Sequence, residues 1–363
     1  MRIHQFSSDD FSCLKDQWQD LLEKTDADKL FMSWYWMHSW WETYGCDSDE
    51  LLLFGAYDDN NQLICIAPFY KNKKIINKYL TINVIQFIGT RFNGPCGFRI
   101  ENLECLSNSN SIDQPIEFIF NYILSNIKFD EFWLHDLIED SETHKQLDLL
   151  LNSYSLIKRR QSNDQSYGVD VSGVYDEYVS SLGKNTRLKF FNRRKVLETK
   201  GEVSLTHVNE DNYLEVLSTL SKFHFLRWET KISYKSHGEF IAKLISDNKI
   251  NVRGIIVYLD DEIIGCTLEL CVDNTAFNIQ SGFKDGVDKK IAMGSLTLGY
   301  AIESYFESHG ITYYDFLAGT GKNTNYKDRI ATPKTQVVTE QLIYSLKLRF
   351  LYYIKDSINN YLN

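Results

Sequence analysis

Three runs of β-forming residues follow one another between residues 252 and 283, and two short acidic turns separate them. Acidic and amide residues at such turns are typical of connections between antiparallel strands. A helical pattern (residues 293–309) and a further β run (residues 311–317) come next. A strand, a helix and a second strand in this order predict a crossover connection within one sheet. This part of the chain is therefore expected to form a mixed sheet with a helix packed on it.

The first half of the chain repeats this order approximately, with helices, a hairpin, a strand, a helix and a strand. Hydrophobic periodicity predicts these elements over residues 11–24, 33–44, 51–70, 83–88, 116–127 and 131–137. In the second half it also predicts helices over residues 174–182, 185–200, 211–228, 238–246 and 346–361, and a late strand over residues 336–343. A shared order in two halves indicates an internal duplication. The expected fold class is α/β (α+β), with two similar domains.

Residues 160–167 are polar and lack periodicity, so we interpret them as a linker. The expected domains are then residues 1–165 and 166–363. The net charge is −10, and the first domain has 15 basic and 25 acidic residues whereas the second has 24 of each. A polyanionic ligand would meet less repulsion on the second domain.

Composition and motifs exclude several classes of protein. No apolar run approaches the roughly 20 residues of a membrane helix, so no integral membrane association is expected. The start of the chain does not have the pattern of a signal peptide, and the seven cysteines include no CxxC pair. These features favour a cytoplasmic protein with reduced cysteines. The eight histidines show no metal-binding spacing, so no metal is expected.

The residues that precede the helix at 293–309 are basic or small. Lys289 and Lys290 supply positive charge, and Ala292 and Gly294 let a ligand approach the backbone. Free backbone N–H groups at the start of a helix favour a phosphate. The alternative interpretation is a solvated loop with an ordinary helix cap.

This loop resembles the pyrophosphate-binding turn of the GNAT acyltransferase superfamily, which reads Q/R-x-x-G-x-G/A. Lys289, Ala292 and Gly294 stand at the three defined positions, with lysine and alanine as departures. The chain also resembles the CelD-like (cellulose-biosynthesis) branch of these proteins, which are relatives of the Fem-type aminoacyltransferases. The resemblance implies tandem GNAT-like domains, each a mixed, mainly antiparallel sheet flanked by helices. It extends over nearly the whole chain and is carried by Phe31, Ser33, Trp36, Trp40 and Trp41; Leu182, Gly183, Lys184, Arg187, Arg193, Arg194 and Leu197; His224, Arg227 and Trp228; and Gly310, Ile311, Tyr314, Asp315, Phe316, Gly319, Tyr326 and Lys327.

The resemblance implies a site for acetyl-CoA or another acyl-CoA in the second domain. The pantetheine arm would lie between the strands at 275–283 and 311–317, bound by backbone groups of the first of them. The residues expected to hold this co-substrate are Gln280, Ser281, Lys289, Lys290, Ala292, Met293, Gly294 and Ser295. The first domain has no matching basic and small loop before its helix at 116–127, so it is expected to shape the acceptor side.

Three residues are candidates for acid–base chemistry. Many GNAT enzymes carry a carboxylate on the strand before the pyrophosphate loop, but residues 275–283 contain none. Asp315 ends the next strand and is either the base or a cap of the loop that follows. Glu269 is either a carboxylate on a solvated face, which we favour slightly, or a site residue with a raised pKa. Tyr326 is either the acid that protonates the leaving thiolate or a packing residue.

Candidate acceptor-binding residues are His224, Arg227 and Lys327. His224 and Arg227 are three residues apart, so one helix face carries both and could hold a carboxylate or phosphate. A structural Arg–His pair is the alternative. The basic segment at residues 184–200 has seven basic residues and one acidic residue, and it could face nucleic acid, anionic lipid or a nucleotide-linked sugar, or simply water.

The sequence therefore predicts a GNAT-type N-acyltransferase. It would move an acyl group from acyl-CoA to an amine or hydroxyl of a small or sugar-linked acceptor, such as a nucleotide-sugar of surface polysaccharide biosynthesis. The alternatives are a Fem-like transferase that uses aminoacyl-tRNA and a non-catalytic binding protein with the same fold. No DNA partner is expected, and tRNA is a partner only under the first alternative.

Overall fold

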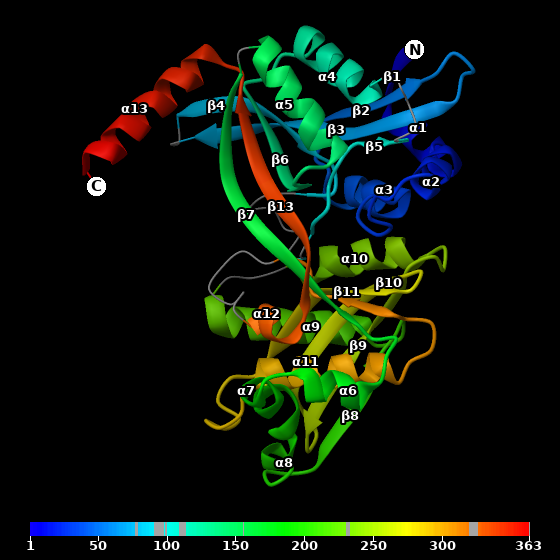
Figure 1. The fold of residues 1–363 in the computed structure, drawn as a ribbon, viewed down its shortest axis with the longest axis vertical. Coiled ribbons are helices and arrows are strands. Elements are labelled where there is room, and N and C mark those ends of the chain that lie inside the picture. Colours follow the sequence, from blue (N-terminus) through cyan, green and yellow to red (C-terminus); the bar gives the residue numbers. More distant parts are fainter. Residues whose placement is uncertain are drawn as a thin grey trace. The chain divides into compact units, whose positions relative to one another are not determined.

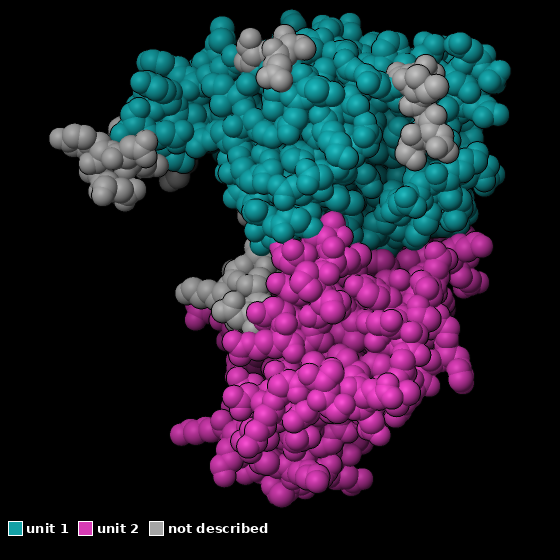
Figure 2. Space-filling view, in the orientation of Figure 1, with its two compact units in different colours: residues 1–92, 101–164, 336–363 teal, residues 93–100, 165–335 magenta. Residues whose placement is uncertain are grey.

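The computed structural model describes residues 1–76, 79–90, 98, 100–108, 114–154, 156–229, 233–318 and 326–362. The chain forms two compact units, which Figure 2 shows in different colours. Unit 1 holds residues 1–92, 101–164 and 336–363, and unit 2 holds residues 93–100 and 165–335. The change of unit after residue 164 lies next to the sequence-derived boundary at 165, but the last 28 residues of the expected second domain belong to unit 1.

Unit 1 is built on a mainly antiparallel sheet in the strand order β1-β2-β3-β4-β6-β13 (Figure 1). Among the described strands of this unit the β4–β6 pair is the parallel one, and the short β5 pairs with β3. The strands are β1 (Arg2–Phe6), β2 (Glu50–Tyr57), β3 (Leu63–Ile76), β4 (Leu80–Phe87), β5 (Leu106–Ser107), β6 (Glu131–Ile138) and β13 (Thr332–Ile343). The helices are α1 (Ser8–Cys13), α2 (Lys15–Glu23), α3 (Trp34–Tyr44), α4 (Pro115–Asn126), α5 (Glu142–Tyr154) and α13 (Leu346–Leu362). Ser33 caps α3, because its side chain accepts a hydrogen bond from the Trp36 N–H at 3.1 Å.

In unit 2 the strand order is β7-β12-β11-β10-β9-β8, and β11 with β12 is the one parallel pair among the described residues of this unit. Its strands are β8 (Val203–Val208), β9 (Asn251–Leu259), β10 (Glu262–Val272), β11 (Thr275–Phe283), β12 (Tyr313–Asp315) and the second part of β7 (Ile157–Asp170), whose first residues belong to unit 1. Its helices are α6 (Tyr175–Ser181), α7 (Lys184–Arg187), the π-helical turn η1 (Leu188–Asn192), α8 (Arg194–Leu197), α9 (Tyr213–Trp228), α10 (Tyr234–Ile245), α11 (Met293–Phe306) and α12 (Lys327–Ile330).

Helices α9 and α11 cover opposite faces of the unit 2 sheet. A Cβ atom added at Gly265 would meet the side chain of Thr297 in α11, whereas one added at Gly282 would meet Leu220 in α9. Gly282 pairs with Cys266, the neighbour of Gly265, and adjacent residues of a strand point to opposite faces. The sheet is therefore enclosed on both sides.

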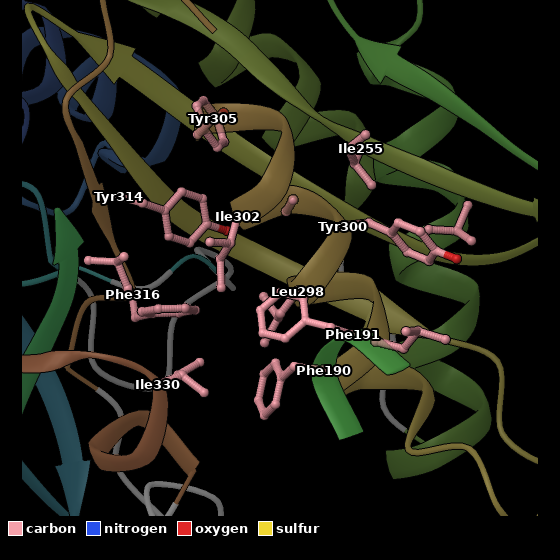
Figure 3. Close-up of a cluster of buried hydrophobic side chains, with 14 of the residues drawn as sticks. Phe190, Phe191, Ile255, Leu298, Tyr300, Ile302, Tyr305, Tyr314, Phe316 and Ile330 are labelled. Carbon is pink, nitrogen blue, oxygen red and sulfur yellow. The ribbon is translucent and has the colours of Figure 1, made fainter. Parts of the chain in front are cut away.

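The core of unit 2 lies between the sheet, α11 and the π-helical turn (Figure 3). Phe190 and Phe191 of η1 are buried against α11 residues such as Leu298 and Ile302. The two backbones approach closely, since a Cβ atom at Gly299 would lie 1.9 Å from the Phe190 carbonyl oxygen. This contact needs glycine at position 299.

Two expectations about secondary structure are wrong. The supposed linker at residues 160–167 is the middle of β7, a strand whose first ten residues are mostly exposed or half-buried and therefore lack an apolar alternation. The expected single helix at residues 185–200 is instead two short α-helices, α7 and α8, with the π-helical turn η1 between them. Strands β1 and β8 and helix α5 were not predicted. No helix among the described residues combines the length and apolarity needed to cross a membrane.

Candidate functional site

Strands β11 and β12 part after a short parallel contact. Their register joins only three residue pairs, and β12 ends at Asp315 opposite Phe277. Strand β11 continues for six more residues to Phe283. Within the described residues, this leaves an edge of β11 with unpaired backbone groups that an extended ligand can use.

A β-bulge lies in β11 just beyond the fork. Leu268 of β10 pairs with Gln280, whereas Glu269 pairs with Asn278, so Ile279 is the extra residue. A bulge leaves backbone groups without ladder partners and turns the following side chains to the other face. Asn278 and Ser281 therefore both face α11, although residues three positions apart in a regular strand face opposite sides of the sheet.

A cavity of about 370 Å³ opens where β11 ends and α11 begins. Its lining comes from residues 281–283 of β11, residues 284–288 of the following loop and the first turns of α11, with Arg227 and Tyr326. The expected co-substrate residues Ser281, Ala292, Met293, Gly294 and Ser295 are all part of this lining. Gln280, Lys289 and Lys290 are not, and the side-chain oxygen Oε1 of Gln280 is buried without a hydrogen-bond partner.

The N-terminus of α11 points its free backbone groups at this cavity. The capping position is Ala292, which offers no side-chain hydrogen bond, and Met293, Gly294 and Ser295 line the cavity. An uncapped helix start with its positive dipole end is suited to an anion. Gly294 has no room for a side chain, because its Cβ atom would lie 2.4 Å from the Phe283 ring.

Ion pairs fix the loop between β11 and α11. The Arg227 guanidinium stacks over the Phe283 ring at 4.1 Å and binds Asp285 at 3.0 Å. Asp288 binds Lys200 at 2.8 Å and accepts a hydrogen bond from the Lys290 N–H at 2.7 Å. The hydrogen bond from Lys200 is the main cause that lowers the pKa of Asp288. The acidic residues of the loop are thus neutralised by basic partners.

Glu269 is fully buried beside the fork, so the interpretation of a solvated face is wrong. Its Oε1 accepts hydrogen bonds from the Tyr314 hydroxyl at 2.8 Å and the Asn278 amide at 2.9 Å, and its Oε2 accepts one from the Thr267 hydroxyl at 3.1 Å. Burial raises the pKa of Glu269 to about 7, although these hydrogen bonds oppose the shift. A carboxyl group with such a pKa exchanges protons readily near neutral pH.

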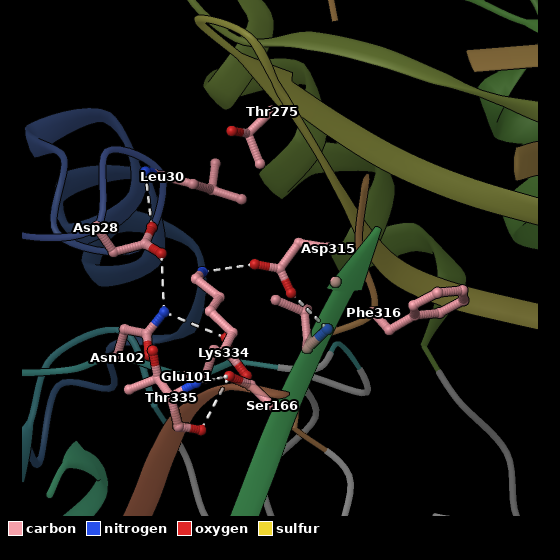
Figure 4. Close-up of polar contacts among 12 residues, drawn as sticks. Asp28, Leu30, Glu101, Asn102, Ser166, Thr275, Asp315, Phe316, Lys334 and Thr335 are labelled. Atoms are coloured by element: carbon pink, nitrogen blue, oxygen red, sulfur yellow. Dashed lines mark hydrogen bonds and ion pairs between the residues drawn. The ribbon is translucent and has the colours of Figure 1, made fainter. Parts of the chain in front are cut away.

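Asp315 is also fully buried, but it is held in two fixed contacts (Figure 4). One carboxylate oxygen accepts a hydrogen bond from the Leu317 N–H at 2.8 Å, and the other binds the Lys334 ammonium at 2.6 Å. The first contact caps the turn after β12, where Leu317 has a φ of 59°. This is the capping role that was the alternative for Asp315.

The remaining expected site residues are divided between the cavity and the core. Tyr326 lines the cavity and lies 6.2 Å from the Phe190 ring, measured between ring centroids. Lys327 is buried and donates hydrogen bonds to the carbonyl oxygens of Phe316 and Leu317 at 3.0 and 2.5 Å. His224 is half-buried on α9 and is not part of the cavity lining. Gly319 lies outside the described residues.

Sequence reasoning missed the partners that give these residues their surroundings. Asp285 holds Arg227, Lys334 holds Asp315, and Tyr314 donates to Glu269 from a strand 45 positions further along the chain. The sequence predicted that Tyr314 and Asp315 lie on one strand, but it did not predict the strand register that brings Tyr314 next to β10. No cluster of three or more potential metal ligands occurs among the described residues.

Comparisons with known proteins agree with this geometry. Residues 184–328, less than half of the chain, match the family model described as an acetyltransferase (GNAT) domain. Among solved structures, FemX has a TM-score of 0.58 at 10% identity and covers 98% of this chain and 100% of its own. A tandem GNAT protein from the clavulanic acid biosynthesis pathway has a TM-score of 0.53 at 9% identity, and the match covers 95% of this chain and 98% of that protein. L-PGS from Bacillus licheniformis has a TM-score of 0.51 at 9% identity, and the match covers 93% of this chain and 94% of that protein.

No curated protein matches the chain in a sequence search. At these identities the solved structures show the fold alone. The expected α/β fold class is confirmed, and a tandem GNAT protein is among the solved structures with a similar fold, while residues 184–328 match the model of a GNAT acetyltransferase domain. The narrower CelD-like assignment stays a prediction.

Proposed function

We propose that unit 2 binds an acyl-CoA in the cavity at the start of α11 and transfers its acyl group to an amine or hydroxyl acceptor. The observation that carries this proposal is the fork between β11 and β12, which leads directly to an uncapped helix N-terminus. An extended arm with amide groups suits the free edge of β11, and a pyrophosphate suits the helix start. One ligand with both parts fits the two features together.

The chemistry that we propose places Glu269 as the general base at the apex of the fork. Asn278 directly follows the last β11 residue paired with β12, and Tyr314 precedes the residue that ends β12. The acceptor nitrogen or oxygen attacks the thioester carbonyl carbon, and its proton passes to Glu269. A free backbone N–H at the bulge of β11 stabilises the oxyanion. The C–S bond then breaks, and Tyr326 supplies the proton for the leaving thiolate.

Glu269 supports this role better than Asp315. The pKa of Glu269 is raised to about 7, so it is often deprotonated at neutral pH and is still basic enough to accept a proton. Asp315 already accepts a hydrogen bond and an ammonium contact, one on each oxygen. Lys327 is assigned a structural role rather than acceptor binding, whereas Arg227 is placed at the cavity and keeps its proposed role.

The acceptor proposal extends the CelD-like resemblance and rests on analogy. We propose a sugar-linked amine or hydroxyl, such as a nucleotide-sugar of surface polysaccharide biosynthesis, in the cytoplasm where acyl-CoA is made. The test is release of free thiol from acetyl-CoA in the presence of amino sugars and nucleotide-linked amino sugars. A rate that depends on both substrates supports the proposal. Acyl-CoA binding without turnover on any acceptor favours the non-catalytic alternative.

Aminoacyl transfer from tRNA is the second candidate, and two observations favour it. The fold likeness to FemX extends over 98% of the chain, and Lys184, Lys189 and Lys195 of the basic segment are exposed. Under this reading tRNA binding falls steeply with salt and requires Arg187, Arg193 and Arg194. Arg194 is committed to Glu303 in a two-contact ion pair at 3.2 and 2.6 Å. A filter-binding measurement with charged tRNA at 50 and 200 mM salt separates this candidate from acyl-CoA use.

A further inference from the structure

Unit 2 contains a second cavity, of about 520 Å³, that shares no lining residue with the first. Its wall comes from the end of β8, the loop at residues 209–211, the start of β9 and the last turns of α11. The first cavity lies at residues 293–298 of α11, and the second lies at Ser304, Tyr305 and Ser308. The two cavities therefore lie at opposite ends of the same helix.

The strand register places two basic side chains on the face of this cavity. Arg253 pairs with Glu269 across β9 and β10, and directly paired residues point to the same face. Cys271, two residues on, faces α11, because its sulfur lies 3.8 Å from the Tyr305 hydroxyl. His207 of β8 pairs with Ile255, two residues beyond Arg253, so it faces the same side.

The Arg253 guanidinium has no hydrogen bond or ion pair with any residue that the structure describes. Its cross-strand neighbour Glu269 is instead bound by Thr267, Asn278 and Tyr314. Arg253 is half-buried and belongs to the cavity lining. A guanidinium in this situation presents a planar set of donors that matches a carboxylate.

The lining of the cavity also carries negative and accepting groups. Glu210 and Asp211 line it and are exposed, with no ion pair to the described residues. The hydroxyls of Ser304 and of Ser308, just after the helix, donate to carbonyl oxygens of α11 at 2.7 and 2.9 Å, which leaves their lone pairs as acceptors. The C-terminal end of α11 also carries the negative end of the helix dipole. These groups suit an ammonium.

We propose that this cavity binds a small zwitterion that carries both a carboxylate and an ammonium group. Arg253 and His207 bind the carboxylate, and Glu210, Asp211 and the end of α11 bind the ammonium. The volume lies within the range of small-molecule sites, so a free amino acid or the end of a short peptide fits. The site shares no lining residue with the cavity proposed for acyl-CoA, and the inference does not rest on the proposed transfer reaction.

The test is isothermal titration of the full chain with four probes. Alanine carries both charges, N-acetylalanine only the carboxylate, alaninamide only the ammonium, and alanylalanine both charges at the ends of a peptide. We expect alanine or alanylalanine to bind at least tenfold more tightly than either singly charged probe, and the better of the two identifies the source. Arg253→Gln is expected to weaken that binding at least tenfold.

Lys249→Gln is the matched control, because Lys249 is exposed just before β9 and does not line the cavity. It removes the same charge and is expected to leave the affinity unchanged. Arg253→Lys is the second variant, to be used if Arg253→Gln lowers the melting temperature. It keeps the charge but loses the planar set of donors, so it is also expected to weaken binding. The proposal is overturned by no saturable binding of any probe, by N-acetylalanine or alaninamide binding as tightly as alanine and alanylalanine, or by equal losses in Lys249→Gln and Arg253→Gln.

Discussion

The carboxyl group of Glu269 is held by three hydrogen bonds at full burial, and this combination determines how it titrates. Burial raises its pKa and the three donors oppose that shift, so the pKa settles at about 7. The neighbouring Tyr314 also has a raised pKa because of its burial, so it stays a neutral donor. The group is therefore poised to change charge within the range where most enzymes work.

Replacing Glu269 with glutamine keeps the shape and removes the proton acceptor. If Glu269 is the base, kcat falls by about 100-fold or more. In the unmodified protein the rate rises with pH through about 7, because the base must lose its proton first, and the variant loses this dependence. Glu239→Gln, on the exposed face of α10, is the control and should leave both the rate and the pH profile unchanged. An unaltered rate in Glu269→Gln would remove Glu269 from the mechanism.

The same pKa also makes a prediction about stability. The folded pKa of Glu269 is raised from 4.5 to about 7, so its contribution to stability is fully present below pH 4.5 and is lost as the pH rises through 7. The loss amounts to about 3 kcal/mol. Urea unfolding at several pH values checks this, because the difference in free energy of unfolding between Glu269→Gln and the unmodified protein should grow in favour of the variant between pH 4.5 and 7.

Glu269 also shows what a sequence conveys at the scale of one residue. Its alternation with Thr267 and Cys271 correctly indicated a shared face. The degree of burial of Glu269 could not be predicted from this alternation, because it depends on α11 and on Tyr314, which are distant in the sequence. The surroundings of Lys327 could not be predicted for the same reason, since its carbonyl partners lie in the turn after β12.

At the scale of elements, the fork between β11 and β12 and the start of α11 together form the proposed donor site. Both strands and the helix were predicted, because their apolar patterns are strong and their turns are acidic or glycine-rich. Strand β7 was not, because its polar first part carries no apolar alternation. The bulge at Ile279 could not be predicted from the sequence either, since it is a property of the pairing with β10 and not of β11 alone.

The close contact between α11 and η1 gives a prediction about elements. Gly299→Ala should lower the free energy of unfolding by about 2 kcal/mol or more, because the new Cβ atom meets the Phe190 carbonyl and the backbones must move apart. Gly173→Ala is the control, since no atom lies within 4 Å of its added Cβ. Equal melting temperatures for the two variants would contradict the packing described for this helix.

At the scale of the whole molecule, two units with related folds have different roles in this account. The donor features belong to unit 2, and the family match at residues 184–328 lies within it. The sequence correctly indicated a tandem arrangement from the repeated order of elements. It could not indicate that residues 336–363 return to unit 1, because that depends on the pairing of β13 with β6.

The division of roles predicts one acyl-CoA per chain. Isothermal titration with acetyl-CoA should give a stoichiometry of one, because the sequence before helix α4 of unit 1 has no counterpart of the basic and small residues at 289–294. A stoichiometry of two would mean that unit 1 also carries a donor site. That result would assign the acceptor to a place other than unit 1.

The central claim is most directly tested by thermal unfolding with CoA, acetyl-CoA and longer acyl-CoAs. At about 100 times its dissociation constant, a ligand stabilises the protein by about 2.7 kcal/mol. Gly294→Glu and Ser295→Glu place a negative charge at the start of α11 and should abolish this shift, whereas Gly173→Glu, in open space in the same unit, should retain it. The unliganded melting temperature of Ser295→Glu shows whether its fold is intact, independently of the Phe283 clash at Gly294. A shift retained in Ser295→Glu, or no shift with any acyl-CoA, would contradict the assignment of unit 2 as the donor site.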